Sequence, residues 1–301
     1  MGKPISRLIK KLREYDEKKL DEIQIGSSIQ MAADTFVFMD KPIKVSGTAL
    51  KQLCTIGRIP SDFFINRLKR EEQAMIFNRL FSGLSETRYM FRFSQDTLYG
   101  IVSPSYTKLD NVLLIDILKD AANTGLDLVP VKSLIHPDHT KVRLVPEGMK
   151  ANELVPMVEF TNSENGMGSL RVWAGVFRVV CGNGLLSEVI SSKSRWIHYG
   201  SGKIQMPDYE IILNQSIEYV ARMEAAKSIY LSASDKTEMI LRLSGALGPT
   251  VADKVVDVAN GQYRGALTLF DAINSVTQAA KSFSAQKQSE TELFSSTLLA
   301  A

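Results

Sequence analysis

Cysteine is scarce in this chain, and its scarcity excludes two classes of protein. The 301 residues include only Cys54 and Cys181, and neither belongs to a CxxC pair or has a histidine at the spacing of a metal ligand. A disulfide framework and a zinc-finger fold are therefore excluded. We expect both thiols to be free, as they are in a reducing compartment.

Long apolar runs are missing as well. No stretch approaches the roughly 18 uninterrupted apolar residues of a membrane span. The charged N-terminus, MGKPISRLIKKLREYDEKKLDE, lacks the apolar segment of a signal peptide. We therefore predict a soluble, cytoplasmic protein with no membrane partner.

The sequence also lacks the common motifs of catalysis and cofactor binding. It contains no GxxxxGKS/T phosphate loop, no GxGxxG between a strand and a helix, no HExxH and no GxSxG. His136, Asp138 and His139 lie close together in the sequence. Such a group is more often a set of solvated turn residues than a zinc site. Cys181 has no neighbouring histidine and is interpreted as a buried, inert thiol. We predict a protein that is not an enzyme and that holds no cofactor and no metal.

The net charge is small, but the charges are unevenly distributed. The chain carries 36 Lys and Arg against 33 Asp and Glu, for a net charge of +3. Residues 1–70 carry 14 basic against 8 acidic side chains, and residues 171–203 carry five basic side chains against Glu188 alone. Such a distribution can follow a phosphate backbone. The alternative is that these side chains are merely solvated.

The order of predicted elements indicates an α+β fold. Residues 1–27 form a charged helical arm, and residues 28–207 form a core of mostly antiparallel strands with one helix at 112–123. Residues 208–281 are predicted to be helical, and the polar residues 282–301 are predicted to form a flexible tail. Segregation of strands from helices argues for α+β and against a doubly wound sheet.

The most informative segment is SLRVWAGVFRVVCGNGLLSEVISSKSRWIHYGSGK, residues 169–203. Alternation in its first strand places Arg171, Trp173 and Phe177 on one face, which could combine base-stacking rings with a phosphate partner. The alternative is that Trp173 and Phe177 belong to the core. We expect Trp196 and Tyr199 to be exposed. The predicted nucleic-acid-binding residues are Arg171, Trp173, Arg178, Lys193, Arg195, Trp196, Tyr199 and Lys203.

Three segments carry a resemblance to a known family. Residues 178–185, RVVCGNGL, resemble the signature Arg-(Leu/Ile/Val)-Val-Cys-x-Asn-x-Leu of a phage- and plasmid-encoded family known as domain of unknown function 932. Residues 100–111 are similar to its strand–turn segment, and residues 267–277 to its closing helix. Pro104 and Phe270 depart from the usual Asp and Trp. The resemblance implies a mobile-element setting near replication and recombination genes, and no activity.

A second resemblance concerns element order alone. The helix at 112–123, followed by strands up to Val180, resembles the small core of single-strand annealing recombinases of the RecT and Red-beta type. Those proteins hold single-stranded DNA in a basic groove of a ring or filament. The likeness is an architectural analogy.

Together these observations favour a non-catalytic, homo-oligomeric protein that binds or anneals single-stranded DNA. The alternative is a protein-interaction, regulatory or structural phage factor that docks a protein partner through its N-terminal arm or C-terminal tail. A third hypothesis, a nuclease or other hydrolase, requires acids or histidines that converge in a pocket.

Overall fold

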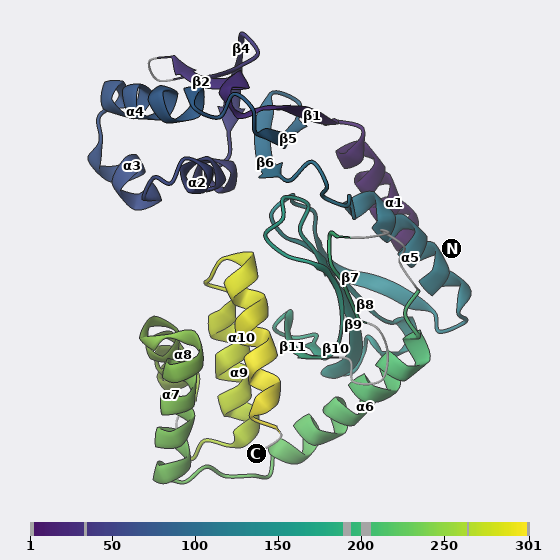
Figure 1. Cartoon of the computed structure of the whole chain (residues 1–301). Coiled ribbons are helices and arrows are strands. Elements are labelled where there is room, and N and C mark those ends of the chain that lie inside the picture. Colours follow the sequence, from purple (N-terminus) through teal and green to yellow (C-terminus); the bar gives the residue numbers. More distant parts are fainter. Residues whose placement is uncertain (1–2, 33–34, 189–193, 200–205, 264, 300–301) are drawn as a thin grey trace.

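The computed structural model describes residues 3–32, 35–188, 194–199, 206–263 and 265–299. In these residues two mostly antiparallel sheets are combined with helices, which confirms the predicted α+β class. Figure 1 shows the two sheets joined through α1, with the C-terminal helices on the far side of the central sheet from α1.

The first sheet and three helices form the N-terminal lobe, which we define as residues 19–102. Its strand order is β1-β5-β6-β4-β3-β2, and β4 pairs with β6 in parallel. Aromatic rings fill its core, among them Phe77 stacked on Phe81. Ser46 caps α2 by accepting a hydrogen bond from the Ala49 amide. The elements are β1 (Lys19–Ile25), η1 (Gly26–Ser28), β2 (Ile29–Ala32), β3 (Thr35–Phe38), β4 (Lys41–Val45), α2 (Gly47–Ile56), α3 (Ser61–Arg67), α4 (Arg70–Ser82), β5 (Arg88–Ser94) and β6 (Thr97–Val102).

The second sheet is the central sheet, with strand order β11-β10-β9-β8-β7 and a short β12 paired with β10. All of its pairs are antiparallel. Directly paired residues in such a ladder present their side chains on the same face. The strands are β7 (Leu128–Leu134), β8 (Thr140–Pro146), β9 (Leu154–Asn162), β10 (Leu170–Arg178), β11 (Asn183–Glu188) and β12 (Arg195–Trp196), with η3 (Glu147–Met149) between β8 and β9.

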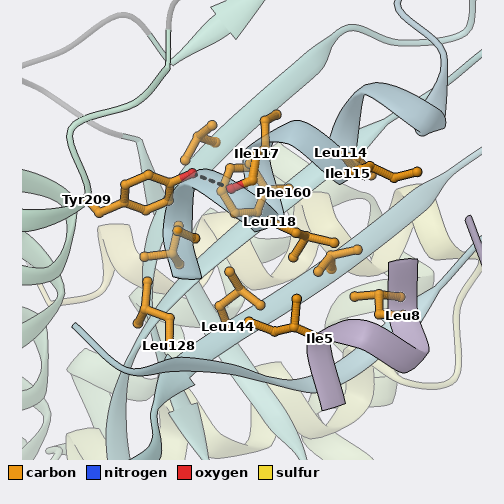
Figure 2. Close-up of a cluster of buried hydrophobic side chains, with 14 of the residues drawn as sticks. Ile5, Leu8, Leu114, Ile115, Ile117, Leu118, Leu128, Leu144, Phe160 and Tyr209 are labelled. Carbon is orange, nitrogen blue, oxygen red and sulfur yellow. Dashed lines mark hydrogen bonds between the residues drawn. The ribbon is translucent and has the colours of Figure 1, made fainter. Parts of the chain in front are cut away.

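One face of the central sheet packs against helices from three parts of the chain, and we call it the α5 face. Figure 2 shows α5 lying over Leu144 and Phe160 of this face, with α1 beside it. The Tyr209 hydroxyl donates a hydrogen bond of 2.8 Å to the Ile117 carbonyl and so joins α6 to α5. The helices are α1 (Lys3–Asp16), η2 (Asn111–Leu113), α5 (Leu114–Asn123) and α6 (Tyr209–Ala226).

The N-terminal segment is therefore not the separate arm that we predicted. Ile5, Leu8 and Leu12 of α1 are buried in the core cluster of the α5 face, and β1 pairs with β5 along its whole length. The apolar spacing of the segment predicts the helix correctly. Its many charges concealed how fully one side of that helix is buried.

The opposite face of the central sheet, which we call the α10 face, carries Val145, Met157, Trp173 and Leu186. It lies against α10 (Ala285–Thr297), in the segment that we predicted to be a flexible tail. Ser284 caps this helix, and Leu293 packs against the apolar cluster of the face. The polar composition misled the prediction because the buried side of α10 is itself polar.

The remaining C-terminal helices form a cluster beside β10 and β11. Capping boxes begin two of them, with Ser232 paired to Asp235 and Thr268 paired to Asp271. The helices are α7 (Ala233–Leu247), α8 (Pro249–Gln262) and α9 (Leu269–Ala280). Across the part of the chain that the structure describes, no helix has the length and apolar character needed to cross a membrane.

Candidate nucleic-acid interface

A cleft of about 750 Å³ lies where the N-terminal lobe, the central sheet and α10 meet. The lobe contributes Gln52 and Ile101, and α10 contributes Ser289 and Leu293. The floor comes from the ends of β9, β10 and β12 and from the loop 163–169. In Figure 1 the N-terminal lobe lies beyond one end of the central sheet and α10 lies beside the sheet. Side chains from distant parts of the sequence thus share one cavity.

Two arginines on the sheet form the basic wall of this cleft. Arg171 of β10 lies directly opposite Arg195 of β12, so both side chains are on the α10 face. The Nε of Arg171 donates to Ser169 Oγ at 3.0 Å, and the Nε of Arg195 donates to the same atom at 3.2 Å. Among the described residues no carboxylate lies within ion-pair distance of either guanidinium. Burial, followed by repulsion from Arg195, lowers the pKa of Arg171.

Trp173 lies beside these arginines on the same strand. Its indole Nε1 donates to Thr161 Oγ1 at 2.9 Å, and the Arg171 guanidinium lies 5.2 Å from the ring centroid. Only 6% of the Trp173 surface is exposed. The ring lines the cleft, but the expected open stacking face is covered, since Leu293 of α10 packs against the same cluster.

A histidine and two tyrosines complete the opposite wall. His198 stacks on Tyr106 with ring centroids 4.7 Å apart. Its Nδ1 lies 3.2 Å from the Thr107 carbonyl oxygen, which assigns the proton to Nδ1 because a carbonyl can only accept. Burial lowers the pKa of His198, and its buried Nε2 has no hydrogen-bond partner among the described residues. Tyr199 is 73% exposed at the rim.

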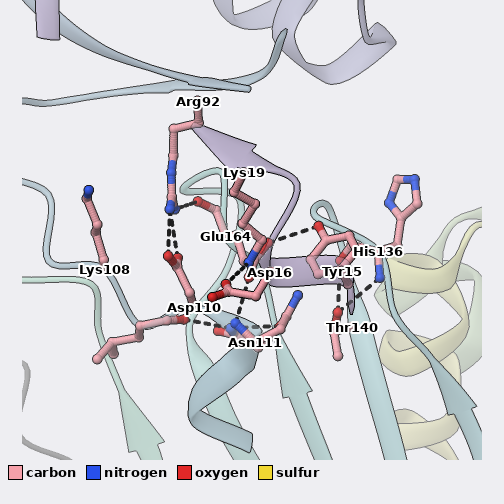
Figure 3. Close-up of polar contacts among 12 residues, drawn as sticks. Tyr15, Asp16, Lys19, Arg92, Lys108, Asp110, Asn111, His136, Thr140 and Glu164 are labelled. Atoms are coloured by element: carbon pink, nitrogen blue, oxygen red, sulfur yellow. Dashed lines mark hydrogen bonds and ion pairs between the residues drawn. The ribbon is translucent and has the colours of Figure 1, made fainter. Parts of the chain in front are cut away.

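The loop under the cleft is held by a buried ionic network, shown in Figure 3. Glu164 accepts hydrogen bonds from Lys19 Nζ at 2.5 Å, the Asn111 amide at 2.6 Å and the Tyr15 hydroxyl at 3.0 Å. Arg92, fully buried, donates to the Glu164 carbonyl and to Asp110. Burial raises the pKa of Glu164. Lys19 and Arg92 of this network each form an ion pair with a carboxylate. The network therefore positions the loop and leaves no unpaired charge for a ligand.

Close backbone packing fixes the next residue of that loop. A Cβ on Gly100 would lie 2.6 Å from Asn165 Cβ, so β6 can approach the loop only with glycine at that position. The Asn165 amide donates to Asp138 Oδ1 at 2.6 Å, and Thr48 donates to Asp138 Oδ2 at 2.8 Å. Asp138 therefore lines the cleft with both oxygens already engaged.

The cleft also contains a serine beside a histidine. Ser289 Oγ lies 3.3 Å from His139 Nε2, within reach of proton transfer. Burial, followed by repulsion from Lys141, lowers the pKa of His139 to about 4. A general base must stabilise the imidazolium that it forms, and this environment opposes it. In the described part of the chain no group of three or more His, Cys, Asp or Glu side chains is placed to hold a metal ion.

The structure brings together four of the eight predicted site residues. Arg171, Trp173 and Arg195 line the cleft with Tyr199. Lys193 and Lys203 lie outside the described residues.

Two of the predicted site residues lie elsewhere. Trp196 was expected to be exposed, but it is 4% exposed because β12 pairs with β10 and places its ring opposite Leu170 in the core of the α5 face. Arg178 lies seven residues from Arg171 on the same strand, and therefore on the opposite face. It forms an ion pair with Glu153 at 2.8 Å.

Sequence reasoning missed Ser169, and it did not assign His198 to the site. It also missed Lys141 and Arg143, which reach the same sheet face from β8. The KVR alternation of β8 carries a signal for one basic face. Strand register, which the sequence did not provide, was needed to place that face beside Arg171.

The segment with the strongest family resemblance has a structural role in this chain. Arg178 joins the end of β10 to Glu153, and Asn183 Nδ2 donates to Thr277 Oγ1 of α9. The Lys281 ammonium donates to the Cys181 carbonyl. These contacts fasten the hairpin between β10 and β11 to the C-terminal helices, away from the cleft.

Comparison with known proteins gives one match. Residues 99–293 match the model of a family described as "Domain of unknown function (DUF932)". This range includes all three segments that carried the resemblance. No curated protein and no solved structure matches the chain. The architectural likeness to annealing recombinases therefore stays a prediction from element order.

Proposed function

The chain belongs to the DUF932 family, and from that premise we propose that it binds single-stranded DNA in the cleft and catalyses no reaction. The family description carries no activity, so the proposal rests on the site. The observation that carries it is the pair Arg171 and Arg195, two facing guanidiniums that form no ion pair among the described residues, with Glu188 of β11 as a more distant acid. Two cations that share one serine hydroxyl and have no carboxylate in direct contact form a site for a phosphate group.

The neighbouring rings suit a nucleotide better than a free anion. Tyr199 offers an exposed ring at the rim, and stacking of one base on such a ring contributes about 1–3 kcal/mol. The cleft volume, about 750 Å³, falls within the range of small-ligand sites, so it holds one or two nucleotides of a longer strand.

The wider role of the protein is part of the same proposal. A phage- or plasmid-encoded protein that holds single strands in this way would act in recombination or replication, as an annealing protein assembled into a homo-oligomer. The resemblance of element order supports that role, and the contacts of the cleft support the binding step alone.

Fluorescence anisotropy with a labelled oligo-dT strand tests the proposal. We expect binding at low salt, with a slope of log affinity against log salt near −1.4, because each of two phosphate contacts on a single strand contributes about −0.7. Arg171→Ala combined with Arg195→Ala should abolish this binding.

The matched control is Arg79→Ala, which removes an exposed arginine of α4 outside the cleft. This variant should bind like the parent chain. Absence of binding by the parent chain at low salt, or equal loss of binding in the control, would refute the proposal.

A second candidate function is protein binding. The helices α3 and α4 expose large apolar side chains, with Phe63 50% and Met75 67% exposed. Exposed apolar surface of this kind is typical of docking sites. A pull-down from host lysate that survives nuclease and high salt, and that is lost in Phe63→Ser combined with Met75→Ser, would favour this function over DNA binding.

A further inference from the structure

The basic row of the cleft continues beneath α10. Lys141 of β8 pairs with Thr161 of β9. Thr161 in turn pairs with Arg171 of β10, and Arg171 pairs with Arg195 of β12. All four side chains are therefore on the α10 face. With strands about 4.8 Å apart, the row spans roughly 14 Å. One line of cations thus runs from the open cleft to the covered part of the sheet.

The covered cations have a different environment from the open pair. Arg143, in the next cross-strand row, is fully buried and donates to Glu159 and to Glu292 of α10. Lys141 Nζ lies 3.3 Å from the same oxygen of Glu292. The Nη1 of Arg143 has no partner among the described residues. A carboxylate from α10 thus occupies the position where a strand running along the row would place a phosphate.

More positive charge surrounds this position than Glu292 and Glu159 neutralise. Lys132 of β7 pairs directly with Arg143. Lys132 is exposed near the end of β7, and partial desolvation, followed by repulsion from Arg143, lowers its pKa against the attraction of Glu292. The region keeps an excess of cations even with α10 in place.

The contact between α10 and the sheet is unusually polar for a buried helix. Its buried residues include Thr291, Glu292, Ser295 and Ser296. Buried ion pairs contribute little net stability, because desolvation of both partners offsets their attraction. A competing polyanion that supplied its own negative charge to Lys141 and Arg143 would replace the main polar contacts of this helix.

We propose that Lys141 and Arg143 form a further phosphate-binding site, which the Glu292 carboxylate of α10 occupies until single-stranded DNA displaces the helix. This inference rests on the proposed function. Displacement would also uncover the apolar cluster that includes Trp173, against which Leu293 of α10 packs, and would supply the second stacking platform that the closed structure withholds. The chain then binds in two stages, first at Arg171 and Arg195 and then along the whole row.

Amide hydrogen exchange of the full chain, with and without oligo-dT, tests this inference. We expect the strand to speed exchange in α10 while leaving exchange in α9 unchanged. Unchanged or slower exchange in α10 would overturn the inference. If Arg171→Ala still weakens binding in that case, the proposed function survives. Absence of any binding by anisotropy would remove both.

A substitution provides a second measurement. Glu292→Gln should bind oligo-dT about tenfold more tightly at low salt, with a salt slope steeper by about 1.4, because two more cations become available to phosphates. The matched control is Glu224→Gln on α6, outside the cleft, where an exposed carboxylate pairs with Lys227 and should change affinity less than twofold. Equal effects of the two substitutions would contradict the inference.

Discussion

Two parts of one sheet face hold their arginines in opposite ways. Under α10, Arg143 is fully buried and bonded to Glu159 and Glu292. At the cleft, Arg171 and Arg195 face each other and share only Ser169 Oγ. Both parts belong to the same antiparallel ladder, so the strands do not cause the difference. The difference depends on whether a carboxylate lies within ion-pair distance of the arginine.

That contrast separates structural charge from charge kept for a ligand. A buried cation with acidic partners costs stability if either side is lost, and while those partners stay in place it has little attraction left for a third group. Removal of a cation without an ion-pair partner changes the free energy of unfolding little, and such a cation keeps its electrostatic attraction for an incoming anion. The contrast therefore predicts that substitutions in the two parts will differ in which measurement they change.

The largest expected effect is on stability, from Arg143→Ala. This substitution leaves the buried carboxylates of Glu159 and Glu292 without their main partner, and such a loss costs about 3–5 kcal/mol of unfolding free energy. Arg195→Ala, at an exposed position without an acid, should cost less than about 0.5 kcal/mol. Urea unfolding followed by circular dichroism measures both. Similar costs for the two variants would remove the contrast.

The next effect is a pH dependence that belongs to His139, at the border between the two parts. Its folded pKa is lowered to about 4 from the usual 6.5, so between these values the unfolded chain binds the extra proton and the folded chain does not. Stability should therefore fall as the pH drops from 6.5 to 4, by roughly 2 kcal/mol after allowance for partial solvent screening.

Unfolding free energies measured across that range provide the test. His139→Gln should reduce the dependence and leave the part that belongs to His198, whose pKa is also lowered by burial. His136→Gln removes the exposed histidine of the same turn, the last of the causes that lower the pKa of His139, and should change the dependence much less. If the His139→Gln curve runs parallel to that of the parent chain, the buried environment inferred for His139 is wrong.

Much of the fold could be predicted from alternation and spacing in the sequence. The period of two in Leu170–Arg178 gave the strand and its two faces, and the apolar spacing of residues 5–12 gave a helix. The sequence failed where a polar segment is buried by polar partners. The helix α10 has no strong apolar face, so its packing depends on the carboxylate of Glu292 against Arg143 together with the apolar contact of Leu293 on this sheet face.

The candidate site was predicted in part, for a related reason. Alternation placed Arg171 and Trp173 on one face, but alternation cannot show what covers a face. Trp196 lies in polar sequence, and only the pairing of β12 with β10 shows that it is buried. The register of β8, β9 and β10 places Lys141 and Arg143 on the same face as Arg171. Register is a long-range property that local sequence patterns do not contain.

The smallest expected effect makes the contrast sharpest, because it compares two arginines of one strand. Arg178 and Arg171 are both in β10, but Arg178 faces away from the cleft and pairs with Glu153 at 2.8 Å, while its guanidinium lies 5.3 Å from the Phe270 ring. Arg178→Ala should therefore cost about 1 kcal/mol of stability and change oligo-dT affinity by less than twofold. Arg171→Ala should show the reverse, with weaker binding and a salt slope reduced by about 0.7.

Anisotropy titrations at three salt concentrations, with unfolding curves for the same samples, distinguish the two residues. If Arg178→Ala weakens binding as much as Arg171→Ala, the DNA does not lie along the α10 face, because a strand held there cannot reach a side chain on the other side of the sheet.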